Sequence, residues 1–288
     1  MSRWWIWLLV GAVASFAQQS APTSSNDADV MVAAVSRDSS MFGGGFDSGI
    51  WTGRGTVYVE PLGYLTQTGE WKALPCSKDW PKTCPKFARE YLNKPHTYIV
   101  VSADGKGATI QATPTKLDEC RYYTGHGTYS GAAIANSAIA ASSADFFADS
   151  EPLKSLSYQD LASIRMELGK LVPSKLDSTR WIRGFSLRLE GQELFVAQRS
   201  YADIAAHANV SYDFIFAIGT MDQGRFHILH WKKNTEDEAE RVLGIIHLKN
   251  GREYLITTVG DPESEWFRVY GIRDGKVALV YEGGGSSC

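Results

Sequence analysis

The chain has 288 residues, of which 44% are hydrophobic, and 29 Lys and Arg against 32 Asp and Glu give a net charge of −3. This length is enough for one large domain, or two smaller ones, with a sizeable core. The mixed, mildly acidic charge argues against binding to nucleic acid or to anionic membranes, because affinity for phosphate depends largely on clustered Lys and Arg.

The first residues have the features of an export signal. Arg3 precedes an apolar run, Trp4–Val13, and small residues follow up to Ala17. The run is about ten residues long, whereas a membrane-spanning helix needs about 20. We therefore predict a cleaved signal peptide over residues 1–17, a secreted, periplasmic or otherwise extracytoplasmic protein, and no transmembrane segment after cleavage.

The rest of the chain divides into three parts. Residues 18–48 are small, polar and Gly-rich, which predicts a disordered leader. Residues 49–180 predict a β-rich N-terminal part with a helix near 158–172, and residues 181–288 predict strands throughout. We expect the last two parts to form one continuous domain.

Four cysteines remain after the signal, namely Cys76, Cys84, Cys120 and Cys288. An even number in an exported chain predicts disulfides, and four cysteines allow three pairings. The short spacing across a Pro-containing loop favours Cys76 with Cys84, which leaves Cys120 with Cys288. A zinc site is the alternative, but the two-residue spacing typical of chelating pairs is missing. We predict no metal and no cofactor.

The N-terminal part contains local signals for strands. Gly55–Glu60 alternates like a strand, and Glu70–Leu74 follows as a short partner. Thr97–Ser102 and Ala108–Thr113 flank a turn with Asp-Gly, which supplies the positive φ that hairpin turns require. The tract of small residues Gly125–Ala144 predicts a tightly packed strand or a buried turn.

Two segments predict short helices. Lys86–Asn93 follows a proline and stops before Pro95. From Ser157 onward, apolar residues lie on one helical stripe that ends at Pro173, and Ser157 with Asp160 three residues later is typical of a helix N-terminus.

The last hundred residues contain an internal match. Gly184–Arg199 can be laid without gaps over Gly244–Val259, and Asp213–Trp231 over Glu265–Glu282. Each copy predicts four strands with Gly-containing turns within each pair and a longer loop between pairs. The eight predicted strands are Trp181–Leu189, Glu193–Ser200, Tyr212–Gly219, Arg225–Lys232, Arg241–Lys249, Glu253–Val259, Trp266–Ile272 and Lys276–Tyr281.

In each copy the elements follow in the order strand, E-G or N-G turn, strand, loop, R-V-Y-type strand, D-G-K turn and strand. This order resembles the β-propeller repeats of exported proteins. The resemblance covers Trp181–Glu282, with a further fragment at Thr97–Thr113. It implies a mainly β protein of antiparallel four-stranded repeats, β-propeller-like, with one or two short helices. An up-and-down β-barrel or a sandwich is the alternative. The Asp cluster of calcium-binding propeller repeats is missing, so the resemblance implies no metal and no activity.

The histidines do not indicate a site. His227 and His230 lie three residues apart on one predicted strand, so we expect them on opposite faces, where they cannot bind one metal. His126 lies close to Ser130, but the segment misses the G-x-S-x-G pattern of a nucleophile elbow by one position.

Carboxylates and one tryptophan are the candidate binding residues. Asp203 and Asp213 lie near one long predicted loop and Asp261 near its counterpart, which makes all three candidates to line one rim. Glycoside hydrolysis needs only two carboxylates, and sequence spacing does not constrain them. Trp80 lies in the Cys76–Cys84 loop, and an exposed Trp can stack on a sugar or anchor a protein partner.

The sequence contains no complete catalytic constellation, so catalytic residues stay unknown and the chain is more typical of a protein that is not an enzyme. The first hypothesis is a secreted, non-enzymatic binding or structural protein whose ligand is a protein or a carbohydrate. The alternative is a secreted carboxylate-dependent hydrolase that acts on glycans, and a third hypothesis is a cell-envelope assembly factor. Fold-level likeness alone does not decide among them.

Overall fold

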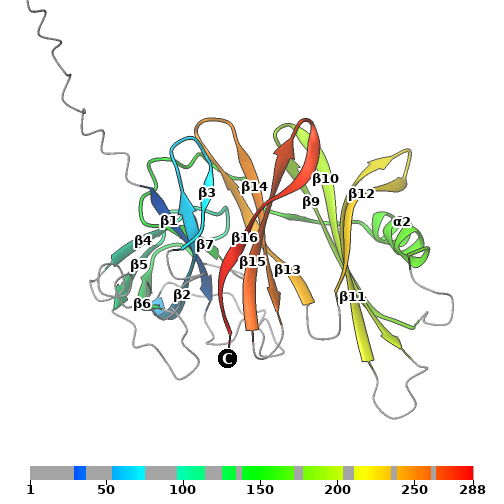
Figure 1. Cartoon of the computed structure of the whole chain (residues 1–288), viewed down its shortest axis with the longest axis horizontal. Coiled ribbons are helices and arrows are strands. Elements are labelled where there is room, and N and C mark those ends of the chain that lie inside the picture. Colours follow the sequence, from blue (N-terminus) through cyan, green and yellow to red (C-terminus); the bar gives the residue numbers. More distant parts are fainter. Residues whose placement is uncertain are drawn as a thin grey trace, which may run out of the picture.

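The computed structural model describes residues 29–36, 54–74, 96–113, 125–133, 138–171, 178–203, 211–234, 239–260 and 264–287. These residues form three antiparallel sheets and a helix that stand side by side in one row (Figure 1). In the order of that row we call them the barrel, the central sheet, the outer sheet and helix α2.

The barrel is built from strands of the N-terminal part. They are β1 (Val30–Ser36), β2 (Arg54–Leu65), β4 (His96–Val100), β5 (Thr109–Thr113), β6 (Gly125–Ser130) and β7 (Ala138–Ala141). They pair in the order β1-β7-β4-β5-β6-β2, and a further pairing of β1 with β2 closes the ring. The short strand β3 (Trp71–Lys72) pairs with β2 outside the ring. So few strands leave only enough interior for side chains, and a buried apolar cluster that includes Met31, Tyr98 and Ile110 fills it.

Strand β1 belongs to two cores at once. Because side chains alternate between the faces of a strand, Met31, Ala33 and Val35 point into the barrel, whereas Val30 and Val32 pack against the central sheet. The prediction of a disordered leader is therefore wrong for β1. Its short apolar patch finds its partners in β2 and β7, which are remote in sequence.

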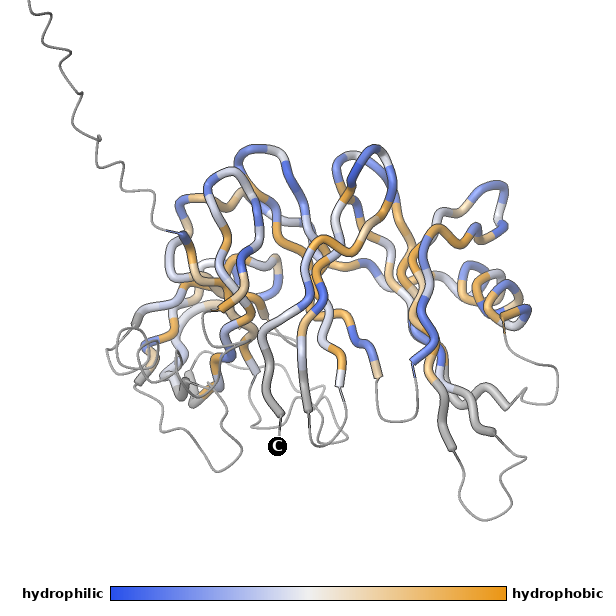
Figure 2. The backbone as a smooth tube through the Cα atoms, viewed as in Figure 1, coloured by the Kyte–Doolittle hydropathy of each residue, from blue (hydrophilic) through white to orange (hydrophobic). Residues whose placement is uncertain are grey.

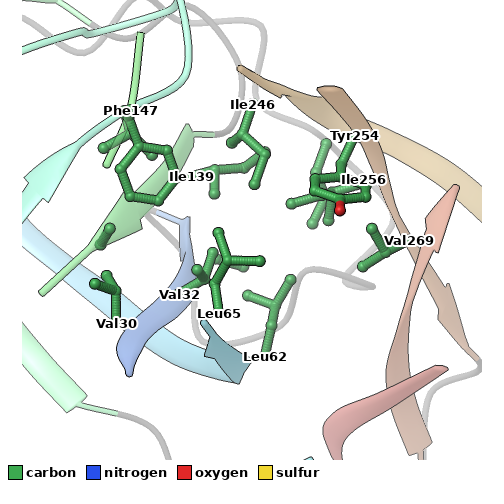
Figure 3. Packing of buried hydrophobic residues seen from close by; sticks show 14 of the residues in the cluster. Val30, Val32, Leu62, Leu65, Ile139, Phe147, Ile246, Tyr254, Ile256 and Val269 are labelled. Carbon is green, nitrogen blue, oxygen red and sulfur yellow. The ribbon is translucent and has the colours of Figure 1, made fainter. Parts of the chain in front are cut away.

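The barrel and the central sheet share an apolar interface (Figure 3). Ile139, Leu62 and Phe147 from the barrel side meet Ile246 and Ile256 of the central sheet. The burial of such apolar side chains is the main favourable term that holds two layers together. The central sheet is thus covered on both faces, by the barrel and by the outer sheet.

The central sheet contains β13 (Ala239–His247), β14 (Glu253–Gly260), β15 (Ser264–Arg273) and β16 (Lys276–Ser287), paired in chain order. The outer sheet contains β8 (Lys154–Ser155), β9 (Ser178–Leu189), β10 (Gln192–Asp203), β11 (Ser211–Asp222) and β12 (Arg225–Asn234), also in chain order. All eight strands predicted for residues 181–288 are present in these two sheets.

Helix α2 (Tyr158–Gly169) covers the far face of the outer sheet, where Ile164 and Leu168 pack against Phe195 and Ile215. Its N-cap is Ser157, whose hydroxyl accepts a hydrogen bond from the backbone of Asp160 at 3.1 Å. The predicted helix near 158–172 therefore has the predicted start. No helix among the described residues is long and apolar enough to cross a membrane.

The predicted β-propeller is wrong. Propellers arrange four or more similar blades around an axis, whereas here the two four-stranded units are followed in the row by a closed barrel on one side and a helix on the other (Figure 1). The hairpin of Thr97–Thr113 belongs to the barrel and is not a third copy. The up-and-down barrel is wrong as well, because the eight predicted strands form two separate sheets and the strands of the barrel are not paired in chain order.

The tract Gly125–Ala144 contributes β6 and β7 to the barrel, in line with a packed strand. The predicted signal peptide, the helix Lys86–Asn93 and the four cysteines lie outside the described residues. The structure therefore leaves these predictions as they stand.

Candidate functional site

Four hairpin turns lie along one side of the row, the upper side in Figure 1. Asn250 of the β13–β14 turn donates from Nδ2 to the carbonyl oxygen of Gln67 in the β2–β3 turn, at 3.3 Å. Gln192, beside the β9–β10 turn, donates from Nε2 to the carbonyl oxygen of Gly275 in the β15–β16 turn, also at 3.3 Å. Figure 2 shows these turns as the most hydrophilic part of the central and outer sheets. Polar turns from three layers thus lie together.

A pocket of about 660 Å³ lies among these turns, and we call it the turn pocket. This volume is in the range of small-molecule sites. Its lining residues are Gly69, Glu70, Trp71, Glu190, Asn250, Gly251, Arg252, Tyr254, Ile272, Arg273 and Val280. The barrel side, the central sheet and the outer sheet all contribute to it.

Aromatic rings form the inner side of the turn pocket. Trp71 stacks on Tyr281, with ring centroids 5.4 Å apart and planes inclined at 22°. It meets Tyr254 edge-on at 5.9 Å, and the Tyr254 hydroxyl donates to the carbonyl oxygen of Gly69 at 2.5 Å. One face of Trp71 is therefore held by Tyr281, and Trp71 stays partly exposed at the pocket.

The rim of the turn pocket carries exposed side chains with planar polar groups, namely Glu70, Glu190, Asn250, Arg252 and Arg273. Two carboxylates and two guanidinium groups cancel in formal charge. Among the described residues, none of these four charged groups forms an ion pair with another residue. Their hydrogen-bonding groups are thus available to a ligand in the pocket.

The residues predicted from the sequence lie elsewhere. Asp203 pairs with Ser211 and Asp213 with Tyr201, at the end of the outer sheet that is remote from the β9–β10 turn. Asp261 and Trp80 lie outside the described residues. The structure therefore does not bring the predicted rim to the turn pocket.

The expectation that His227 and His230 lie on opposite faces of a strand is wrong. A bulge in β12 places His227 opposite Thr220 and His230 opposite Ile218, so both histidines are on the same face of the outer sheet. The expectation of opposite faces assumed a regular strand. No group of three or more His, Cys, Asp or Glu side chains suited to a metal ion occurs among the described residues.

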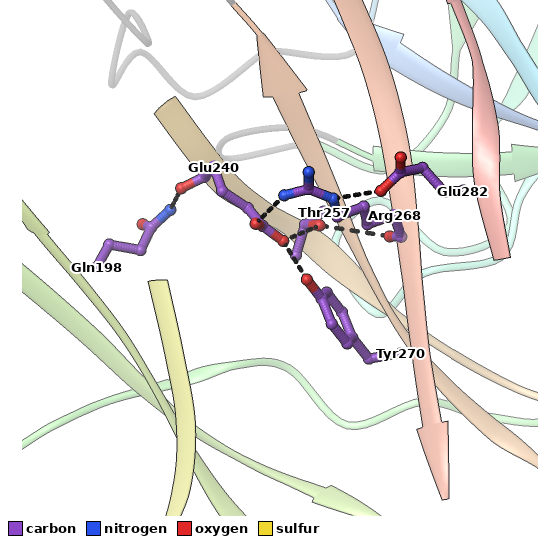
Figure 4. A network of polar contacts seen from close by, with 6 residues as sticks. All are labelled: Gln198, Glu240, Thr257, Arg268, Tyr270 and Glu282. Carbon is purple, nitrogen blue, oxygen red and sulfur yellow. Dashed lines mark hydrogen bonds and ion pairs between the residues drawn. The ribbon is translucent and has the colours of Figure 1, made fainter. Parts of the chain in front are cut away.

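A second polar cluster is buried between the central and outer sheets (Figure 4). Arg268, of which 2% of the side chain is exposed, donates to Glu240 and to Glu282, each at 2.6 Å. Glu240 also accepts from the hydroxyls of Tyr270 at 2.7 Å and Thr257 at 2.9 Å. From the outer sheet, Gln198 donates to the backbone carbonyl oxygen of Glu240.

The electrostatics of this cluster follow from burial. Burial disfavours the charged form of Arg268, but Glu240 and Glu282 outweigh it and raise the pKa of the guanidinium group. Burial and the charge of Glu240 both raise the pKa of the Tyr270 hydroxyl. The carboxylate of Glu240 therefore has donors for both oxygens, which is how buried charges are accommodated.

This buried cluster lies between the two sheets, and Gln198 joins it to the outer sheet. His230 packs on the Tyr270 ring, 5.2 Å between centroids, and burial lowers the pKa of its imidazole. Within the part of the chain that the structure describes, the side-chain amide of Asn234 and the ring nitrogen Nε2 of His230 are buried without a hydrogen-bond partner. The turn pocket has the volume of a small-molecule site and is the candidate ligand site.

Sequence reasoning missed the turn pocket because its residues come from four separate hairpins. The sequence predicts the E-G and N-G turns and a short strand at Glu70–Leu74, but nothing in it indicates that they meet. No protein-family model, no curated protein and no solved structure matches this chain.

Proposed function

We propose that the protein is an exported, non-enzymatic binding protein that takes a neutral carbohydrate in the turn pocket. The observation that carries this proposal is the combination, in one pocket of about 660 Å³, of partly exposed Trp71 with a rim on which four charged groups have no ion-pair partner among the described residues. Export follows from the sequence of residues 1–17 and stays a prediction.

Each part of the pocket fits the chemistry of a sugar. The C–H groups on one face of a sugar ring are apolar and pack on an aromatic ring such as Trp71. Adjacent hydroxyls match planar side chains that offer two atoms, as the carboxylate of Glu190 and the guanidinium group of Arg273 do. Because the charges of the rim cancel, the pocket offers no net attraction to a charged ligand.

The first experiment measures binding of maltotriose, cellotriose and triacetylchitotriose by calorimetry and by saturation-transfer NMR. We expect at least one of them to bind, and Trp71→Ala to weaken that binding about 30-fold or more, as loss of a central aromatic contact does. Trp231→Ala is the matched control, because Trp231 is 45% exposed on β12 and lines no part of the pocket.

Trp71 also packs against the interface between barrel and central sheet, so its replacement removes packing there as well. Glu190→Gln and Arg273→Ala avoid this because both side chains are exposed. We expect each to weaken sugar binding about tenfold at unchanged melting temperature. Failure of every sugar to bind, or binding that neither Trp71 nor the rim variants alter, would remove the proposal.

A carboxylate-dependent glycan hydrolase is the second candidate, and one observation favours it. Glu70 and Glu190 approach the same pocket from different layers, and glycoside hydrolysis uses a pair of carboxylates as acid and base or nucleophile. In that case the wild-type protein releases shorter sugars from the same trisaccharides, and Glu70→Gln or Glu190→Gln abolishes release. Binding without release supports the binding protein.

A further inference from the structure

Two walls of the turn pocket are held to the central sheet. The β2–β3 turn is fixed to it by two bonds, from the Tyr254 hydroxyl to Gly69 and from Asn250 to Gln67. On the opposite wall, the pocket residue Glu190 belongs to the outer sheet, a different layer. The bond from Gln192 to Gly275 ties its hairpin to the central sheet, and the backbone of Glu190 itself has a second contact there.

Glu253 provides that contact. One carboxylate oxygen, Oε2, accepts a hydrogen bond from the backbone N–H of Glu190. The other oxygen, Oε1, lies 3.0 Å from Nδ1 of His247. Glu253 and His247 are direct cross-strand neighbours on β14 and β13, so the sheet itself holds the carboxylate in place.

The β9–β10 turn presents a free N–H to this carboxylate. Glu190 and Gly191 have φ angles of 48° and 80°, both in the left-handed region, as in a two-residue hairpin turn of the primed type. In this register Leu189 pairs with Gln192, which leaves the N–H of Glu190 pointing out of the hairpin. A carboxylate is a strong acceptor for such a group.

We propose that Glu253 is the positioning residue of the turn pocket: it touches no ligand, but its carboxylate fixes Glu190 and thereby the wall from the outer sheet. Only 18% of the Glu253 side chain and 14% of the His247 side chain are exposed, so water competes weakly for both contacts. This inference rests on the proposed function for its consequence in binding. The link from Glu253 to Glu190 can be tested without a ligand.

The experiment uses the full chain and measures amide hydrogen exchange at Glu190 by NMR, together with the dissociation constant of the best-binding trisaccharide. We expect Glu253→Ala to speed exchange of the Glu190 amide at least about tenfold and to raise the dissociation constant by a similar factor. Glu253→Gln keeps an oxygen acceptor and should restore most of the protection. Glu193→Ala, an exposed carboxylate on β10 outside the pocket, is the matched control.

The outcomes separate the two proposals. Unchanged exchange at Glu190 in Glu253→Ala, or faster exchange spread over the whole outer sheet, overturns the positioning role. A sugar that binds wild type and Glu253→Ala equally well overturns it too, and leaves the binding proposal intact. If no sugar binds the wild-type protein, the proposed function fails, and the exchange at Glu190 still decides whether Glu253 holds the turn.

Discussion

The interface between the central and outer sheets has two unlike halves. Next to the turn pocket it is apolar, with buried side chains from both sheets, among them Leu194, Val196, Ile245 and Leu255. We call this the apolar half. At the other end it contains the cluster of Gln198, Glu240, Thr257, Arg268, Tyr270 and Glu282 (Figure 4), and His230 packs on the Tyr270 ring. We call this the polar half.

The two halves stabilise the protein in different ways. Apolar burial has no preferred direction, so the apolar half contributes free energy without fixing how the sheets align. The hydrogen bond from Gln198 to the backbone carbonyl oxygen of Glu240 crosses between the sheets and has direction, so it forms in one alignment. Arg268, Tyr270 and Thr257 bond to Glu240 within the central sheet. A buried ion pair often contributes little compared with apolar residues of the same size, but removing one partner is costly. We therefore expect small side-chain changes to lower the free energy of unfolding more in the polar half than in the apolar half.

The largest expected effect comes from Arg268→Ala. It leaves the carboxylate of Glu240 buried without its counter-charge, and we expect the free energy of unfolding to fall by about 3–5 kcal/mol. Chemical denaturation measures this loss. Glu282→Gln is the control, because 45% of that side chain is exposed, and it should cost at most about 1 kcal/mol.

The double variant Arg268→Met with Glu240→Leu sharpens the test. If the polar half fixes the alignment of the two sheets and adds no net stability, removing both charges together should recover most of the free energy of unfolding that Arg268→Ala loses. A double variant as unstable as Arg268→Ala would show that the cluster itself supplies the free energy, and the contrast between the halves would disappear.

A pair of smaller changes compares the halves directly. Tyr270→Phe removes one oxygen atom and with it a donor to buried Glu240, and we expect a loss of about 1.5–3 kcal/mol. Ile245→Val removes one methylene group from the apolar half and should cost about 0.5–1.5 kcal/mol. Equal losses, measured by denaturation under the same conditions, would contradict the claim that the polar half is more sensitive.

The sequence predicted the eight strands of the two sheets because alternation and turn residues are local signals. It did not predict the barrel, since the ring is completed by pairings such as that of β1 with β7, which is remote along the chain. The propeller was wrong for a related reason. A repeated pattern specifies the unit, whereas the neighbours of each unit are set by segments outside the repeat.

The internal match also hides a difference in turn length. The β9–β10 turn has two residues and the β13–β14 turn has three. In the matched second strands, Phe195 and Leu255 both point toward the α2 end of the row. In the first strands, Gly184 faces Leu156 on the α2 side, but Gly244 faces the barrel. One additional residue thus inverts the facing of β13 between Gly244 and the turn, and a bulge beside Val242 restores it, because Val242 again packs toward the outer sheet. An ungapped match reveals neither change.

The smallest expected effect is a pH dependence that arises in the polar half. Burial, together with the charges of Arg268 and Lys232, lowers the pKa of His230 below its usual 6.5, although the charge of Glu240 opposes the shift. The unfolded chain therefore binds a proton at a higher pH than the folded one. Stability contributed by neutral His230 is fully present above about pH 6.5 and is lost as the pH falls through and below that value.

We expect the melting temperature of the wild-type protein to fall between pH 7.5 and pH 5.5, and His230→Gln to reduce that fall. His227→Gln is the matched control, since His227 is exposed on the same strand and the same face. Melting curves at several pH values give the slope of melting temperature against pH for each variant. Comparing these slopes cancels any difference in stability that does not depend on pH. A wild-type slope that His230→Gln leaves unchanged would assign the pH dependence to groups outside the polar half.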